Sequence, residues 1–237
     1  KKNKIKVFSM IDNYWWMKER IDFFKKNSYP DKLFVINNIA KNIALNNGCL
    51  KKKIYLLPEM NFYKKKIKKK IKNNNSSNKL LFISEPLSRA YKMYKKKSKK
   101  NEYFFLNILI KNKPKNFDIH LKLHPRENPK KYDKYKNKIK RIINTNKVVD
   151  HNHYKFTFGL LSIYNFDIGK MGHHSMLFKC PPNESYIKLF KNMNIISSPF
   201  DINTLFKKKI KKIKKNKNYN SLRNKNNKYE FNSFFKI

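Results

Sequence analysis

Short apolar segments alternate with segments of helical periodicity along this chain, and this alternation constrains the fold more than any other feature. An apolar run of about four to eight residues is typical of a buried strand, whereas apolar residues spaced three and four apart indicate a helix. Repeated alternation of this kind implies parallel strands with helices packed across them. The sequence therefore predicts an α/β protein with two Rossmann-like domains, each built on a parallel sheet.

The predicted elements run along most of the chain. Strands are predicted at residues 5–11, 32–37, 52–58, 80–84, 118–123, 147–150, 161–169, 185–190 and 194–198. Helices are predicted at residues 14–24, 38–47, 101–110, 129–136, 175–179 and 202–210, and a further helix carries Tyr91 and Tyr94. Gly48 stands just past the second helix, where a left-handed cap is expected.

A lysine-rich stretch separates the two predicted domains. Residues 63–79 contain too little apolar surface to pack and are typical of a charged, flexible linker. Residues 1–62 are therefore assigned to one Rossmann-like domain and residues 80–210 to a second, with 211–237 as a basic, disordered tail. Because the chain begins with Lys1 and no initiator Met, we expect a fragment or a processed product.

The net charge of +43 invites a polyanionic partner, but the composition offers another explanation. Only five of the 58 basic residues are arginine, whereas recognition of phosphates and bases favours the planar arginine fork. Lysine, asparagine, isoleucine, phenylalanine and tyrosine have AT-rich codons, so genome composition accounts for their abundance. We therefore expect no specific nucleic-acid partner. A basic protein that coats nucleic acid or an anionic membrane is the alternative from another functional class.

Several kinds of site and location are disfavoured by what the sequence lacks. No apolar run reaches the roughly 20 residues of a membrane helix, and the two cysteines form no CxxC pair. A cytoplasmic location is expected, with peripheral contact at the inner face of an anionic membrane. The pairs His151 with His153 and His173 with His174 lack partners at ligand spacing, so no metal is expected. No dinucleotide or Walker motif is present, and no cofactor is expected.

The segment DIHLKLHPRE, residues 118–127, carries the first candidate site. A strand runs into a sharp turn that presents His124, fixed by Pro125, at the carboxyl edge of a parallel sheet, where ligands of such sheets bind. The imidazole could donate to a phosphate oxygen, with the planar charge of Arg126 beside it. Alternatively, His124 could cap the strand and bond a backbone carbonyl.

Two other turns carry candidate binding residues. Gly169 and Gly172 predict a turn before a helix that begins at Ser175, whose hydroxyl and neighbouring amides would bind phosphate. An ordinary helix cap is the alternative at this position. Ser84 and Glu85 end the first strand of the second domain, where Glu85 would hold a ribose hydroxyl and Ser84 a phosphate or base edge. A simple turn is the alternative there.

Together these segments resemble the C-terminal half of GT-B glycosyltransferases, in particular bacterial sialyltransferases, polysialyltransferases and related capsule enzymes. In that family a His-Pro motif after a strand binds the donor phosphate, and a later Ser-Ser or Ser-Thr pair completes the nucleotide site. His124-Pro125 matches the first motif, and Ser175 matches one member of the second, with His174 in place of the other. The resemblance implies a metal-independent enzyme that moves a sugar, such as sialic acid, from a CMP- or UDP-linked donor to a surface glycan.

The resemblance implies that residues 1–62 are the C-terminal part of an N-terminal, acceptor-binding domain that is incomplete in this sequence. It also places the general base in that domain, within an Asp/Glu-Asp/Glu-Gly motif. The sequence contains no such triplet, and Asp12 is the acidic residue that follows an early predicted strand. Asp12 is therefore the candidate for the base, with capping of the next helix as the alternative. Polyol-phosphate polymer transferases, as in teichoic-acid synthesis, and sugar epimerases are alternatives with the same fold.

Overall fold

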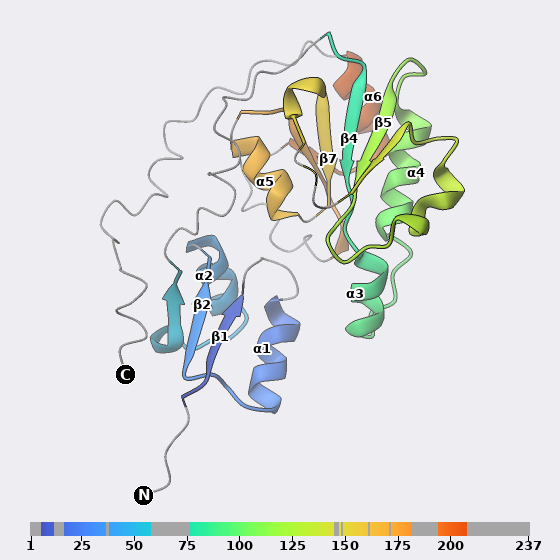
Figure 1. The fold of residues 1–237 in the computed structure, drawn as a ribbon. Helices are drawn as coiled ribbons and strands as arrows, with labels where there is room; N and C mark the ends of the chain where they lie inside the picture. Colours follow the sequence, from blue (N-terminus) through green and yellow to red (C-terminus); the bar gives the residue numbers. More distant parts are fainter. Residues whose placement is uncertain are drawn as a thin grey trace, which may run out of the picture. The chain divides into compact units, whose positions relative to one another are not determined.

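The computed structural model divides the chain into two compact units (Figure 1), one of residues Lys1–Lys65 with Lys214–Ile237 and one of Lys66–Ile213. Each unit contains a sheet whose paired strands are all parallel, with helices packed on it. The predicted α/β class with two Rossmann-like parallel sheets is therefore confirmed. The structure describes residues 6–11, 17–36, 38–57, 76–144, 147, 149–160, 162–170, 172–181 and 194–207.

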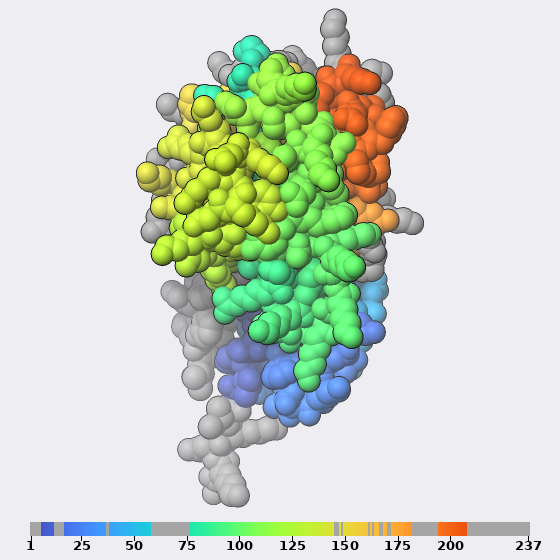
Figure 2. Space-filling view, turned by 90° about the vertical axis from the view of Figure 1, so that its right-hand side faces the viewer, coloured from blue at the N-terminus to red at the C-terminus, as the bar shows by residue number. Residues whose placement is uncertain are grey.

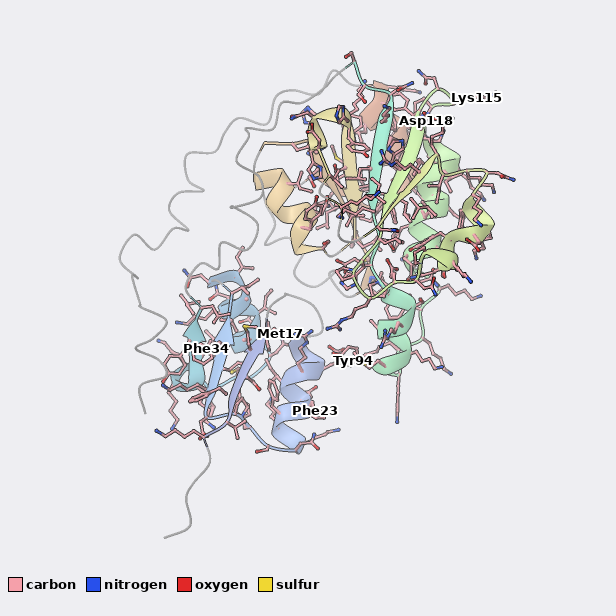
Figure 3. All side chains as sticks on the ribbon, viewed as in Figure 1. Met17, Phe23, Phe34, Tyr94, Lys115 and Asp118 are labelled. Atoms are coloured by element: carbon pink, nitrogen blue, oxygen red, sulfur yellow. The ribbon has the colours of Figure 1, made fainter. Side chains whose placement is uncertain are left out.

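The first unit is built on a three-stranded sheet in the order β1-β2-β3. Its elements are β1 (Phe8–Ile11), α1 (Met17–Lys26), β2 (Lys32–Val35), α2 (Asn38–Asn46), the 3-10 turn η1 (Lys51–Lys53) and β3 (Ile54–Leu56). Met17 from α1 and Phe34 from β2 are both buried in this unit (Figure 3). Gly48 has φ of 84°, the left-handed cap that the sequence predicted after α2.

The second unit is a six-stranded sheet in the order β6-β5-β4-β7-β8-β9. Its strands are β4 (Lys79–Ile83), β5 (Asp118–Lys122), β6 (Arg141–Ile143), β7 (Phe156–Gly159), β8 (Ser175–Phe178) and β9 (Asn194–Ile196). Its helices are α3 (Leu87–Met93), α4 (Glu102–Asn112), the 3-10 helices η2 (Pro129–Tyr135) and η3 (His151–His153), α5 (Ile163–Lys170) and α6 (Pro199–Lys207). When the strands are renumbered from 1 within this unit, the order is 3-2-1-4-5-6, as in the Rossmann fold. The order in which the strands are added to the sheet switches from one side to the other between β4 and β7.

Both faces of this sheet are covered, which explains why its central strands are apolar at successive positions. On one face, α5 and the segment before β7 pack on a cluster of Leu81, Ile83, Ile143, Val149, Tyr154 and Ile168. On the other face, aromatic rings from the sheet meet α4 and α6: Phe82, Phe156, Phe158 and Phe178 contact Phe105 or Phe206 directly or through one another.

Three predicted elements of the second unit are wrong. The segment predicted as a strand at 161–169 falls largely within helix α5, and the helix predicted at 175–179 is strand β8. The described residues of the strand predicted at 147–150 are not in a strand, and β6 lies earlier, at Arg141–Ile143. Strand β7 at Phe156–Gly159 lies in a segment for which no strand was predicted. A short apolar run that is buried on both faces has no periodicity to separate strand from helix, and all four residues of β7 and of β8 are buried.

Some predictions fall outside the described residues. These are Asp12, the strand predicted at 185–190, most of the predicted linker 63–79 and the predicted tail 211–237. Within the part of the chain that the structure describes, no helix combines the length and the apolar composition needed to cross a bilayer.

Candidate functional site

The loops that follow β4 and β5 begin side by side at the carboxyl edge of the six-stranded sheet. Ile83, the last residue of β4, pairs with Lys122, the last residue of β5. The predicted residues Ser84 and Glu85 therefore lie at the same edge as His124. This edge includes the switch point between β4 and β7, where open α/β sheets bind ligands.

The ring of His124 is fixed by the turn that contains it. Its Nδ1 accepts a hydrogen bond from the backbone N–H of Arg126 at 3.1 Å, and its carbonyl oxygen accepts the backbone N–H of Glu127 at 2.9 Å. Burial lowers the pKa of His124, and the positive charges of Arg126 and Lys131 lower it further, against the opposing effect of Glu127. The imidazole is therefore neutral at pH 7 with its proton on Nε2, which leaves Nε2–H to donate to a ligand.

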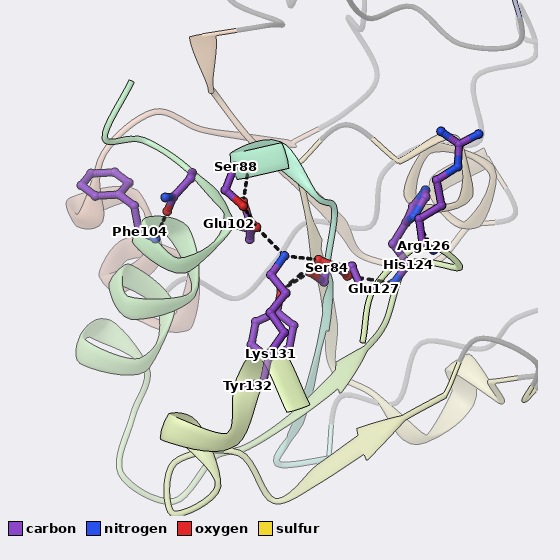
Figure 4. Close-up of polar contacts among 10 residues, drawn as sticks. Ser84, Ser88, Glu102, Phe104, His124, Arg126, Glu127, Lys131 and Tyr132 are labelled. Carbon is purple, nitrogen blue, oxygen red and sulfur yellow. Dashed lines mark hydrogen bonds and ion pairs between the residues drawn. The ribbon is translucent and has the colours of Figure 1, made fainter. Parts of the chain in front are cut away.

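Arg126 extends from the same turn as His124. Arg126 is exposed, and Figure 4 shows its guanidinium pointing away from the buried polar residues behind the turn. A half-buried imidazole N–H beside an exposed guanidinium suits the oxygens of a phosphate, because both groups donate and one is always charged. Pro125, between them, is exposed as well.

Behind the turn lies a group of contacting polar side chains, here called the Lys131 cluster: Ser84, Glu102, Glu127, Lys131 and Tyr132 (Figure 4). Lys131 Nζ donates to carboxylate oxygens of both Glu102 and Glu127, whose side chains are 0% and 1% exposed. Burial alone lowers the pKa of Lys131, but hydrogen bonds to the two carboxylates and their charge raise it above its usual range. Lys131 therefore stays cationic between two buried carboxylates.

Glu127 connects this cluster to the candidate phosphate-binding turn. Its Oε2 accepts the backbone N–H of His124 at 3.0 Å, and its Oε1 accepts the hydroxyls of Ser84 at 2.9 Å and Tyr132 at 3.3 Å. One carboxylate thus joins the end of β4, the turn after β5 and the 3-10 helix η2. Such a contact set holds the backbone of His124 in one position and leaves its ring to meet a ligand.

Ser84 is a buried member of the Lys131 cluster. It is 1% exposed, and its hydroxyl contacts both Glu127 and Tyr132. The hydroxyl is therefore not presented to a phosphate or a base. Ser88 likewise donates its backbone N–H and its hydroxyl to Glu102, at 2.8 Å and 2.6 Å, which ties α3 to α4.

Glu85 occupies the switch point itself. It is half-buried and hydrogen-bonded to Ser162 in the loop after β7, so it connects the two strands between which the order reverses. Burial raises the pKa of Glu85 to about 8, with further increase from the charges of Glu127 and Glu102, although the Ser162 hydrogen bond opposes it. At pH 7 this carboxyl is mostly protonated, so it can donate to or accept from a hydroxyl without repelling a phosphate.

The remaining predicted residues lie elsewhere on the sheet. Ser175 is the first residue of β8 and His174 precedes it, so both are at the amino edge, away from His124. Ser175 is 2% exposed, and its hydroxyl donates to the Oδ1 and the carbonyl oxygen of Asn165 at 2.6 Å and 2.8 Å. The predicted helix start at Ser175 is wrong, so the phosphate site that depended on it has no structural basis. Gly172 is exposed, with φ of 93°, in the turn after α5.

The sequence reasoning missed most of the Lys131 cluster. Glu127 carried one usable signal, because it directly follows His-Pro-Arg in a chain with only 15 acidic residues. Glu102 and Lys131 are 29 positions apart and meet only in the folded sheet. Among the described residues, no group of three or more His, Cys, Asp or Glu side chains is arranged to hold a metal ion.

Gly159, the last residue of β7, allows Asn165 of α5 to approach the sheet. A Cβ at this position would lie 2.7 Å from Asn165 Cγ, and Asn165 Nδ2 donates to the Met176 carbonyl at 2.9 Å. We expect Gly159→Ala to lower the free energy of unfolding by about 1–3 kcal/mol, measured by urea denaturation. Gly172→Ala, with nothing within 4 Å of its Cβ, should cost about 1 kcal/mol through backbone strain alone. A loss close to zero for Gly159→Ala would show that Asn165 moves aside.

Comparison with known proteins adds little to this geometry. No protein-family model matches the sequence, and no curated protein is significantly similar to it. A solved structure described as accessory secretory protein 1, 2 and 3 in Streptococcus pneumoniae is similar, with a TM-score of 0.42 and 9% sequence identity. The match covers 79% of this chain and 37% of that chain, so the chain spans well under half of that protein's length. The function of this chain therefore has to be argued from its site.

Proposed function

We propose that the six-stranded unit binds the nucleotide of an activated sugar at its carboxyl edge, and that the chain is part of a metal-independent glycosyltransferase of two Rossmann-like domains. The observation that carries the proposal is the state of His124. Its Nδ1 accepts the backbone N–H of Arg126 at 3.1 Å, which leaves Nε2 as the ring nitrogen that carries the proton and can donate it to a ligand. The expected donors are CMP- and UDP-linked sugars, and the expected acceptor is a surface glycan.

Under this proposal the phosphate of the leaving nucleotide meets His124 and Arg126. As the bond to the sugar breaks, negative charge grows on the phosphate oxygens, and donors already aimed at those oxygens stabilise it without reorganising. His124 supplies a neutral N–H, and Arg126 supplies a charged, planar pair of donors. No proton has to leave either group, which is consistent with their role as electrostatic stabilisers of the leaving group.

The ribose or the sugar would be held at the switch point by Glu85 and Ser162. A protonated Glu85 can both donate to and accept from the two hydroxyl groups of a diol. An ionised Glu85 could only accept, and its charge would repel the phosphate. Lys131 contacts the two other carboxylates nearby, Glu102 and Glu127, and offsets one of their two negative charges. Arg126, which is exposed in the turn beside His124, adds a second positive charge for an anionic ligand.

Calorimetric binding of CMP, CDP, UMP, UDP and ADP at two salt concentrations tests the proposal. We expect saturable binding that favours the pyrimidine nucleotides and persists at the higher salt concentration. His124→Ala should weaken that binding about 10- to 100-fold, the range for losing a hydrogen bond to a charged group. The matched control is His153→Ala, because His153, in η3, is exposed and its Nε2 lies 3.5 Å from Oδ2 of Asp150.

Two outcomes would count against the proposal. Equal binding of all five nucleotides that falls steeply with salt would indicate nonspecific attraction to a strongly basic chain. Equal weakening by His124→Ala and His153→Ala would show that His124 has no particular place in the nucleotide site.

A further inference from the structure

We propose that the C-terminal part of α3, together with the connection from α3 to α4, is a docking surface for an anionic membrane, and that it brings the carboxyl edge of the six-stranded sheet to the bilayer. This surface, here called the lysine loop, is residues 89–100, of which 89–93 are in α3. Its seven basic residues are all exposed: Arg89, Lys92, Lys95, Lys96, Lys97, Lys99 and Lys100.

The lysine loop contains no acidic residue of its own. No acidic residue occurs between Pro86 and Asn101. The two acids that flank this stretch are turned into the protein, since Glu102 is fully buried against Lys131 and Glu85 is half-buried against Ser162. The local field at this surface is therefore strongly positive, beyond what the average charge of the chain would produce.

The lysine loop is held in a defined shape. Tyr91 is 4% exposed, its hydroxyl donates to the carbonyl of Lys100 at 2.9 Å, and its own carbonyl accepts the backbone N–H of Lys96 at 2.8 Å. Asn101 then caps α4 by accepting the backbone N–H of Phe104 at 3.2 Å. Because one buried tyrosine joins both ends of the loop, its charges are presented together at little further cost in backbone entropy.

The lysine loop lies at the functional edge of its unit. Helix α3 starts directly after β4, at the carboxyl edge, and α4 leads back to the amino end of β5. Tyr94, within the loop, lies at the opposite end of the unit from Asp118, the first residue of β5 (Figure 3). Figure 2 shows the side chains of this green segment projecting from the surface. A membrane bound here would face the side of the sheet that carries His124.

The chemistry of the lysine loop fits a lipid surface better than a nucleic acid. Six of its seven basic residues are lysine, a compact hydrated charge suited to anionic headgroups. Met93 is 65% exposed among them and supplies an apolar side chain for the interfacial region. The loop presents no exposed aromatic ring for base stacking, because Tyr91 is buried and Tyr94 is half-buried.

The test is sedimentation with vesicles of phosphatidylcholine alone and of phosphatidylcholine with phosphatidylglycerol. The loop variant replaces Lys92, Lys96, Lys97, Lys99 and Lys100 by glutamine and keeps Lys95, whose φ is 51°. The control variant has the same net charge and replaces five exposed lysines outside the loop: Lys111, Lys115, Lys130, Lys138 and Lys140. Circular dichroism and thermal melting establish that both variants are folded.

We expect the loop variant to bind the anionic vesicles about 100-fold or more weakly than the native chain, since each lysine near such a surface contributes about fivefold. The control variant should lose less than about tenfold, and none of the proteins should bind phosphatidylcholine alone. This result requires no nucleotide, so it stands or fails separately from the proposed function. Equal losses in the two variants would overturn the proposal and leave charge spread over the whole chain as the cause.

Met93→Ser separates a membrane from a nucleic-acid partner. We expect it to weaken binding to the anionic vesicles about fivefold by removing apolar contact with the interface, and to leave binding to duplex DNA unchanged. If the native chain instead binds DNA more tightly than the vesicles at equal salt, and the loop variant loses that binding, the partner is a nucleic acid and the membrane proposal is wrong.

Discussion

Replacing Lys131 by methionine is expected to destabilise the six-stranded unit by about 3–5 kcal/mol, because removing one partner of a buried ion pair leaves uncompensated charge. Here the charge left behind is double, since Lys131 contacts both Glu102 and Glu127, and their side chains are 0% and 1% exposed. Methionine keeps most of the side-chain volume, so the loss reports on charge rather than on a cavity.

Urea denaturation at pH 7 measures this effect. Lys130→Met is the matched control, because its exposed neighbouring position should change the free energy of unfolding by less than about 0.5 kcal/mol. Adding Glu102→Gln and Glu127→Gln to Lys131→Met should recover part of the loss, because the buried charges then disappear together. A loss below about 1 kcal/mol for Lys131→Met alone would show that water reaches the two carboxylates.

Acidification should destabilise the same unit through two buried histidines. Burial lowers the pKa of His173 to about 3, with further lowering from His151 and His174, and burial lowers the pKa of His151 to about 4. Neither ring nitrogen of His173 has a hydrogen-bond partner among the described residues, and His151 Nε2 lies 2.8 Å from the hydroxyl of Tyr164. Both rings are therefore buried in the neutral form.

The sign follows from where the protons bind first. In the unfolded chain a histidine takes up its proton near pH 6.5, so the stability contributed by a depressed folded pKa is complete above that pH. It is lost as the pH falls from about 6.5 towards the folded values of about 4 and about 3. At about 1.4 kcal/mol per pKa unit, the full loss is on the order of 3 kcal/mol for His151 and 5 kcal/mol for His173.

Urea denaturation at pH 7 and pH 4 tests this with His173→Leu. The variant should lose about 3 kcal/mol less than the native chain over that interval, because one depressed titration is absent. His153→Leu is the control: His153 is exposed, and its loss should match that of the native chain. If His173→Leu and the native chain respond equally to acid, the pKa of His173 is not lowered by folding.

The sequence predicted those elements whose local pattern matches their environment. Strands β4 and β5 each lead into a loop with proline, and the side chain of Asn101 caps the first turn of α4. The prediction failed where burial on both faces removes periodicity. In an α/β unit the helices run in the opposite direction to the parallel strands. Mistaking a helix for a strand therefore assigns the residues at its end to the wrong edge of the sheet. The exchange of α5 and β8 therefore moved Ser175 from the amino edge to the carboxyl edge in the prediction.

The sequence by itself determined that His124 and Glu85 follow strands of a parallel sheet, because strand, turn and proline are local signals. Only the tertiary structure decided how these residues behave. The tautomer of His124, the raised pKa of Glu85 and the pairing of Lys131 with Glu102 depend on burial and on contacts between distant segments. Desolvation has no local sequence signature, since it is created by whatever the rest of the chain packs around a group. A lysine side chain is a solvated charge at one position of a chain and a buried counter-ion between two carboxylates at another, and only the fold distinguishes the two positions.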